Sequence, residues 1–333
     1  MRVVVLHNFV APDAPAEDRD TLVQVDAVAE ALARLGHEPM TLSCTLDLTG
    51  MYDELPRVRP DVVFSLVESL AGADSLVYLP AAVLDVLGVP YCGCRTESLF
   101  LTTHKTLAKE RMRRFGLPTP AWIEHETTAP TPDKPLAASH GPSAWILKGV
   151  WDQGSRGLDD DAVLRNVEPA EVQSRLAERA TRSGRPCFAE QFIEGREFNL
   201  GLLAGPDGPE SLPPAEIDFS AFPPEKPRIV GYRAKWEDDS FESRNTPRHF
   251  DFPPSDAPLL QRLRDLARQC WAVFRLRGWA RVDFRVDAAG EPWILEINGN
   301  PCLSPDAGFA AAMQQASILY DQGIQRILED ALT

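Results

Sequence analysis

Short apolar strands alternate with amphipathic helices near the start of the chain, and this alternation limits the fold more than any other feature. Apolar runs at 2–6, 62–66 and 89–93 have the length of buried strands, and a further strand is expected at 39–42. Apolar residues recur every three or four positions at 22–35 and 76–87, and a glycine ends each pattern. This order predicts an open α/β layer with parallel strands, ending near residue 100.

The pattern changes to α+β in the rest of the chain. Stretches rich in proline and glycine at 118–142 and 205–227 predict loops. We expect domains at 1–100, 101–186 and 187–333. Helices are expected at 104–115, 171–182, 256–277 and 308–331, and strands at 144–148, 187–192, 196–203, 279–286 and 292–297.

The charge balance excludes several classes of partner. The 49 acidic and 34 basic residues give a net charge of −15, so the chain lacks the basic surface that nucleic acids and anionic membranes attract. No apolar run is long enough to span a membrane, and no secretory signal is visible. The six cysteines show neither zinc-site nor paired spacing. Together these features predict a cytoplasmic protein with reduced thiols.

Residues 279–298 predict a β-hairpin that brings opposed charges together. A loop at 288–291 would pair Val286 with Trp293. Residues two apart share one face of a strand, so the same register predicts four polar side chains on one face of the hairpin. These side chains are Arg281, Asp283, Glu296 and Asn298, with Asp283 opposite Glu296 and Arg281 opposite Asn298.

This group of side chains has two interpretations. Two carboxylates and an amide oxygen are hard ligands that suit Mg²⁺ beside phosphates. Like charges placed opposite each other on a sheet also favour a cation between them. The alternative is an exposed strand face on which Arg281 neutralises Asp283, because surface ion pairs are common.

Further motifs accompany the hairpin in a fixed order. The hairpin itself carries RVDF at 281–284, LEIN at 295–298 and Pro301. Before it come GVPYCG at 88–93, HKT at 104–106, GLPTP at 116–120, WILK at 145–148, GSRG at 154–157, EQFIEGRE at 190–197 and AKW at 234–236. This series resembles the ATP-grasp ligases, and their D-alanine–D-alanine ligase branch in particular.

The resemblance implies an ATP-grasp fold with an N-terminal Rossmann-like domain that holds substrate, and with ATP between two α+β lobes. It places Lys105 and Lys148 on the phosphates, and Ser155 and Gly157 in a phosphate-binding loop. It also implies an adenine and ribose site formed by Glu190, by the backbone of Phe192 and Ile193, and by Glu197.

The resemblance also implies a reaction. A carboxylate takes the γ-phosphoryl group of ATP and becomes an acyl phosphate, which an amine attacks with loss of phosphate. Mg²⁺, with Mn²⁺ as the alternative metal, would be held by Asp283, Glu296 and Asn298. Lys235 would close over the γ-phosphate, and Arg281 would stabilise the oxyanion. The partners would be small-molecule carboxylates and amines, and homodimers are frequent among similar ligases.

The substrate pocket departs from the D-alanine–D-alanine ligase pattern. The loop at 8–20 lacks the Gly-Gly-x-Ser-x-Glu motif with which that family holds the first amine. Glu68 stands where the family carries His-Gly, and is either a substrate contact or a surface acid. Ala307 stands where the family has a serine for the acceptor carboxylate, and Asp306 beside it would favour a cationic or polar amine.

We therefore expect an ADP-forming carboxylate–amine ligase that makes an amide or peptide bond. Its substrate would be an amino acid or specialised metabolite other than D-alanine. The alternatives are a true D-alanine–D-alanine ligase, a carboxylate kinase, and a nucleotide-binding protein that has lost ligation.

Overall fold

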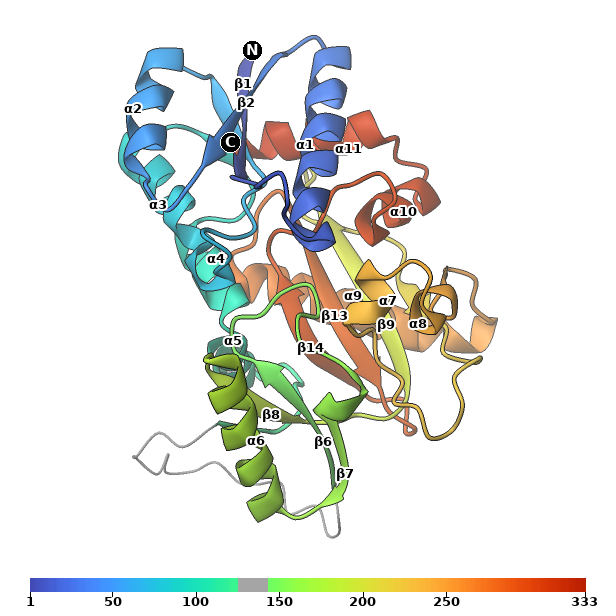
Figure 1. Cartoon of the computed structure of the whole chain (residues 1–333). Helices are drawn as coiled ribbons and strands as arrows, with labels where there is room; N and C mark the ends of the chain where they lie inside the picture. Colours follow the sequence, from blue (N-terminus) through green and yellow to red (C-terminus); the bar gives the residue numbers. More distant parts are fainter. Residues whose placement is uncertain (125–142) are drawn as a thin grey trace.

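Three β-sheets organise the residues that the computed structural model describes, 1–124 and 143–333 (Figure 1). Most of the loop predicted at 118–142 lies outside these ranges. Within them, no helix is long and apolar enough to cross a membrane. Three short 3₁₀ turns connect the regular elements: η1 (Asp74–Leu76), η2 (Asp160–Ala162) and η3 (Pro254–Asp256).

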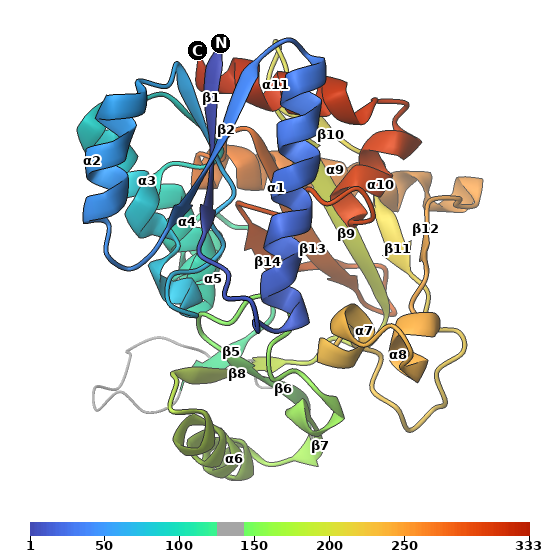
Figure 2. The same ribbon diagram turned by 45° about the horizontal axis from the view of Figure 1, so that its top comes forward.

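The first sheet is the parallel α/β layer that the sequence predicts. Its strands run in the order β2-β1-β3-β4, and each pair is parallel. The first helix covers one face of the sheet, together with a helix from the C-terminal end of the chain, and two helices cover the other face (Figure 2). The strands are β1 (Arg2–Asn8), β2 (Glu38–Cys44), β3 (Val62–Ser65) and β4 (Tyr91–Cys92), and the helices are α1 (Ala16–Arg34), α2 (Thr49–Val58) and α3 (Tyr78–Leu87).

Several helices differ from the prediction. The first helix begins at Ala16, inside the loop predicted at 8–20, and neither α2 nor α4 (Thr96–Thr103) was expected. Pro56 lies inside α2, which explains why a pattern search passes over it. The single helix predicted at 308–331 is wrong. The chain forms α10 (Gly308–Gln315) and α11 (Tyr320–Ala331), separated where Ser317 adopts a positive φ of 59°.

The second sheet forms a small lobe. Its antiparallel strands run in the order β5-β8-β6-β7, and Val172 and Leu176 of α6 pack against it. Helix α5 connects this lobe to the first layer through α4. The elements are α5 (Lys105–Arg114), β5 (Trp122–Glu124), β6 (Ser143–Gly149), β7 (Val163–Val167), α6 (Pro169–Ser183) and β8 (Cys187–Gln191).

The third sheet carries the predicted hairpin. Its order is β12-β11-β9-β13-β14, with β10 paired to β9, and α9 packs against its buried face. Two of these short strands, β10 and β11, fall in the segment predicted as loop at 205–227. The elements are β9 (Arg196–Leu203), β10 (Glu210–Ser211), β11 (Ala215–Ile217), α7 (Tyr232–Trp236), α8 (Phe241–Arg244), β12 (Arg248–His249), α9 (Ala257–Phe274), β13 (Trp279–Val286) and β14 (Pro292–Asn298).

Packing crosses the predicted domain limits in two places. Helix α11 returns to the first layer, where Ile324 and Ile327 share a core with Val25 and Val28 of α1. Both chain termini consequently lie at the first layer (Figure 2). Met112 of α5 joins the core beneath α9. The division at residues 100 and 186 stays a prediction.

Candidate functional site

A cavity of about 580 Å³ lies where the three sheets meet. This volume falls within the range of small-molecule sites, roughly 300–1,000 Å³. The cavity is lined by α1, the β3–η1 loop, the small lobe and the face of the third sheet opposite α9. Every residue that the sequence analysis assigned to nucleotide, metal or substrate lines this cavity, with the single exception of Gly157.

The hairpin pairs as predicted at its polar end and differently at its turn. Arg281 lies opposite Asn298 and Asp283 opposite Glu296. Val286 pairs with Pro292 instead of Trp293, because a β-bulge at Leu295 shifts the register by one residue. The bulge turns both Leu295 and Glu296 toward the cavity, although neighbouring residues of a regular strand face opposite sides.

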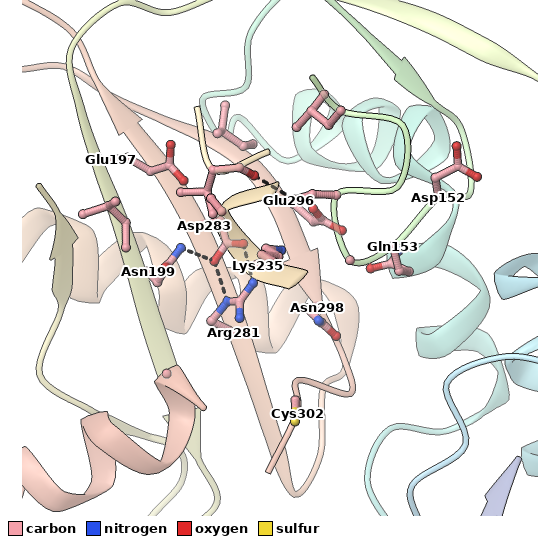
Figure 3. A pocket seen from close by; sticks show the side chains of 18 of the residues that line it. Asp152, Gln153, Glu197, Asn199, Lys235, Arg281, Asp283, Glu296, Asn298 and Cys302 are labelled. Carbon is pink, nitrogen blue, oxygen red and sulfur yellow. Dashed lines mark hydrogen bonds and ion pairs between the residues drawn. The ribbon is translucent and has the colours of Figure 1, made fainter. Parts of the chain in front are cut away.

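Asp283 is held by two strands. Arg281 donates from Nε and Nη2 to its carboxylate oxygens at 2.7 and 2.8 Å, and Nδ2 of Asn199 on β9 donates at 2.8 Å. The neutralisation considered from the sequence is therefore present, but the pair lies inside the cavity and not on an exposed face (Figure 3). Burial lowers the pKa of the Arg281 guanidinium, and the carboxylate of Asp283 more than reverses this effect, so that Arg281 stays charged.

Glu296 faces cations from two other elements. Nζ of Lys105 on α5 donates to Oε1 of Glu296 at 2.6 Å, and Lys235 projects from α7 into the same space (Figure 3). Burial raises the pKa of the Glu296 carboxyl, but Lys105 and Lys235 outweigh it and hold that pKa at about 2. The pKa of Lys235 is lowered, first by burial and then by Arg281.

These oxygens fit Mg²⁺ that is shared with phosphates. Asp283 and Glu296 lie directly opposite each other, and Asn298 lies two residues further along the same face. In the part of the chain that the structure describes, no group of three or more histidine, cysteine, aspartate or glutamate side chains could hold a metal ion. An octahedral metal here therefore needs amide and ligand oxygens to complete its shell, as Mg²⁺ does in phosphate-binding sites.

A buried lysine that the sequence analysis missed lies behind the nucleotide residues. Glu190 is 1% exposed and forms ion pairs with Lys148 and Lys109. Burial raises the pKa of Glu190, yet the two ammonium groups together lower it below its ordinary value. Lys109 follows Lys105 by one helical turn on α5, and this i, i+4 spacing was the signal available in the sequence.

The glycine-containing loop after β6 is fixed by contacts to distant segments. Gly154 and Ser155 have positive φ values of 63° and 61°. The Ser155 hydroxyl donates to the Val230 carbonyl at 2.8 Å, a partner not foreseen for a phosphate donor. Gly157 accepts a hydrogen bond from Arg179 through its carbonyl. Trp236 donates from Nε1 to the Gly154 carbonyl at 2.8 Å, so α7 is joined to this loop.

The proposed base pocket is apolar with a charged rim. The Phe192 N–H donates to the Ala144 carbonyl at 2.8 Å, so this one of the backbone groups expected to contact a base is already paired. Glu197 pairs with Arg285 at 2.8 Å, and the sequence analysis did not identify this arginine. The apolar lining consists of Ile146, Leu158, Phe192, Ile193, Ile229 and Leu295.

Acids gather where the first layer meets the cavity. Gln24 donates to Oε1 of Glu68 at 2.5 Å, and Asn8 accepts from the Glu68 N–H at 3.1 Å. Burial raises the pKa of the Glu68 carboxyl to about 7, and Asp20 adds to this shift. The Cys302 thiol and the Ser304 hydroxyl both contact the Asp20 carboxylate, at 3.1 Å each.

Charges of both signs line the opposite end, at α10. Ala307 is the N-cap of α10 and gives it no side-chain cap. Asp306 precedes it, and Arg248 of β12 lies close enough that its Cζ would be 3.6 Å from a Cβ built on Gly308. The backbone of Arg248 pairs with β11, but its guanidinium has no hydrogen bond or ion pair within the described residues. Sequence analysis missed Arg248 because β12 is only two residues long.

The fold and the cavity define an ATP-grasp protein with a Rossmann-like N-terminal domain. The family model described as "D-ala D-ala ligase C-terminus" matches residues 163–329, about half of the chain. The chain belongs to the D-alanine–D-alanine ligase family of ATP-grasp ligases.

Individual proteins agree with this assignment. "Uncharacterized protein y4sG" of Sinorhizobium fredii is 30% identical over 92% of this chain and 86% of that protein. A "D-alanine--D-alanine ligase" of Synechococcus sp. (strain JA-3-3Ab) is 28% identical over 100% of this chain and 94% of that protein. The fold matches the crystal structure of the Bacillus anthracis D-alanine–D-alanine ligase complexed with ATP, with a TM-score of 0.72, 21% identity and coverage of 100% and 97% of the two chains.

Proposed function

We propose that this chain is an ATP- and Mg²⁺-dependent carboxylate–amine ligase, which forms an amide or peptide bond through an acyl phosphate and releases ADP. The observation that carries the proposal is the convergence of three lysines and two opposed carboxylates on one cavity. Lys105 comes from α5, Lys148 from β6 and Lys235 from α7, and they surround the hairpin that bears Asp283 and Glu296. Such a set of charges suits a triphosphate with its metal.

Each group has a role that its position supports. Lys105, Lys148 and Lys235 bind and orient the phosphates. Mg²⁺, when bound by Asp283, Glu296 and Asn298, neutralises charge during phosphoryl transfer. Arg281 uses Nε and Nη2 for Asp283, so its Nη1 donors can stabilise the oxyanion that forms when the amine attacks the acyl phosphate.

We further propose that the substrates differ from two D-alanines. Glu68 and Asp20 line the acidic end of the cavity, and Gln24 donates a hydrogen bond to Glu68 from behind it. An ammonium group of the donor would be favoured at this end. At the acceptor end, Asp306 and Arg248 line the cavity together. This pair suits an amine that also bears an anionic group, a class that includes the α-amino acids. The proposed departure from D-alanine therefore rests on the absent Gly-Gly-x-Ser-x-Glu motif and on Ala307 in place of the family's serine.

A second candidate is a true D-alanine–D-alanine ligase. The names of the Synechococcus and Moorella thermoacetica relatives favour it, and each matches the whole of this chain. Phosphate release from Mg²⁺ and ATP, measured across a panel of carboxylates and amines that includes D-alanine, separates the two candidates. Turnover with D-alanine as the sole substrate would support the second candidate. It would contradict the proposal that the substrates differ from two D-alanines.

The ligase reaction has its own test. Phosphate release should require the carboxylate and the amine together. Accumulation of a hydroxylamine-trappable acyl phosphate as the final product without amine dependence would identify a carboxylate kinase. Glu296→Gln should lower turnover at least about 100-fold, because it removes a charged metal ligand. Glu291→Gln is the matched control, since Glu291 lies at the surface beside the turn of the same hairpin and pairs with Arg262 at 2.6 Å.

A further inference from the structure

A buried arginine lies at the base end of the cavity and has no role in the proposed reaction. Arg285 is 3% exposed and follows Asp283 by two residues on β13, so the two share the cavity face of that strand. Burying a guanidinium is costly unless each donor is paired. The contacts of Arg285 therefore indicate what its charge does.

Arg285 connects three segments around the base end. Its guanidinium pairs with the carboxylate of Glu197 at 2.8 Å, and it donates to the carbonyls of Gly195 and Arg228. Glu197 is its direct cross-strand partner on β9. Gly195, with a φ of +142°, makes the turn that brings its carbonyl close to the end of β13, where a side chain would collide with the Val286 carbonyl.

Aromatic rings restrict the same guanidinium. The centroids of Phe192 and Phe219 each lie 5.5 Å from its Cζ. The two rings therefore limit where the guanidinium that pairs with Glu197 can lie. Burial raises the pKa of Glu197 and Arg285 opposes that rise, so the arginine also favours the ionised, acceptor-only form of the carboxylate.

We propose that Arg285 is a positioning residue for nucleotide recognition, which holds the Glu197 carboxylate aimed at the ribose hydroxyls and so makes binding depend on the sugar. This inference rests on the proposed use of ATP. It assigns no chemistry to Arg285, which acts only through the carboxylate. A simpler alternative is that Arg285 merely ties the Gly195 turn to the segment at 228.

Nucleotide binding separates these two roles without knowledge of the substrates. The affinities of the full chain for MgATP, Mg-2′-deoxyATP and Mg-3′-deoxyATP are measured by titration calorimetry. The natural chain should bind ATP at least about tenfold more tightly than one of the deoxy analogues, as expected for a hydrogen bond to a charged group. Arg285→Met should reduce this ratio to nearly one, and Glu197→Gln should have the same effect.

Three further variants complete the experiment. Combining Arg285→Met with Glu197→Gln should add nothing to either single change, because both remove the same interaction. Arg285→Lys keeps the positive charge but lacks the planar, multiple donors of a guanidinium. It should retain only part of the preference for ATP over the deoxy analogues. Arg262→Met is the control, since it breaks an exposed arginine–glutamate pair, at 47% and 51% exposure, and neither residue lines the cavity.

Each outcome decides the inference. If Arg285→Met weakens all three nucleotides equally, or keeps the natural ratio, the positioning role is wrong. Should Arg285→Met fail to fold by circular dichroism, Arg285→Lys decides, and an unchanged ratio there overturns the proposal. Failure of the natural chain to bind ATP would instead contradict the proposed function. Tight ATP binding without any preference for the ribose hydroxyls would contradict only the role of Arg285.

Discussion

Replacing Glu68 with glutamine should change how the stability of the protein depends on pH. The folded structure raises the pKa of this carboxyl from 4.5 to about 7, chiefly through burial. Each pKa unit corresponds to about 1.4 kcal/mol, so the shift amounts to at most about 3 kcal/mol. Glu68 is only partly buried and borders the open cavity, and solvent screening reduces the measurable effect to about 1–3 kcal/mol.

The sign follows from proton binding. Between pH 4.5 and about 7 the folded state keeps the Glu68 proton that the unfolded state has lost. The stability linked to this group is therefore fully present below pH 4.5 and is lost as the pH rises to about 7. Glu68→Gln mimics the protonated form at every pH. Its advantage over the natural chain should consequently grow across this window.

Urea unfolding of both proteins at about pH 5 and about pH 8 measures this difference. The free-energy gap between Glu68→Gln and the natural chain should widen by about 1–3 kcal/mol at the higher pH. Glu30→Gln controls for the loss of one acid, because Glu30 is 74% exposed on α1. A gap that is equal at both pH values would refute the account of Glu68 as a carboxyl destabilised by burial.

Three further substitutions test other contacts. Lys109→Met should lower the free energy of unfolding, measured in urea, by about 3–5 kcal/mol, because it removes one of the two cations that pair with buried Glu190. A loss under about 1 kcal/mol would contradict a stabilising role for this buried ion pair. Trp236→Phe should raise the KM for ATP roughly fivefold in a phosphate-release assay, because it deletes the 2.8 Å hydrogen bond from Trp236 to the Gly154 carbonyl. A change in kcat with an unchanged KM would contradict a role of this bond in ATP binding. Arg248→Met should raise the KM for acceptors that bear a carboxylate about tenfold and leave the KM for the corresponding amides unchanged. Equal effects on the two kinds of acceptor would exclude a contact between Arg248 and the acceptor carboxylate.

The sequence predicted the pairing at the polar end of the hairpin, although the turn from which that register was counted pairs differently. The prediction holds because the bulge at Leu295 adds back the one residue by which the turn is shorter. Alternation along two strands placed Asp283 opposite Glu296, and the structure has this pairing. The turn end depends on a distant segment. The Ile294 N–H donates to the Pro118 carbonyl at 2.8 Å, next to the bulge that changes the pairing of Val286. The spacing of residues within the hairpin cannot predict a contact with a segment so far away in the sequence.

The missed cavity residues have a similar explanation. Lys109, Arg248 and Arg285 lie on a helix, a two-residue strand and a β-strand whose neighbours come from remote parts of the chain. Their functional significance arises from partners such as Glu190 and Glu197, which a linear pattern does not bring together. The α/β layer was easier to predict, because strands and helices there alternate in short, regular steps and pack against sequence neighbours.

The bulge at Leu295 divides the hairpin into two stretches that can vary independently. Toward Asn298, the pairing fixes the spacing of the two carboxylates that we propose as Mg²⁺ ligands. Toward the turn, a separate alignment presents Leu295 and Arg285 to the base pocket. Substitutions that alter nucleotide preference can accumulate in the second stretch while the distance between Asp283 and Glu296 is kept. In the proposed ligase, the one inserted residue would thus let base selection evolve, or be engineered, without redesign of the phosphoryl-transfer site.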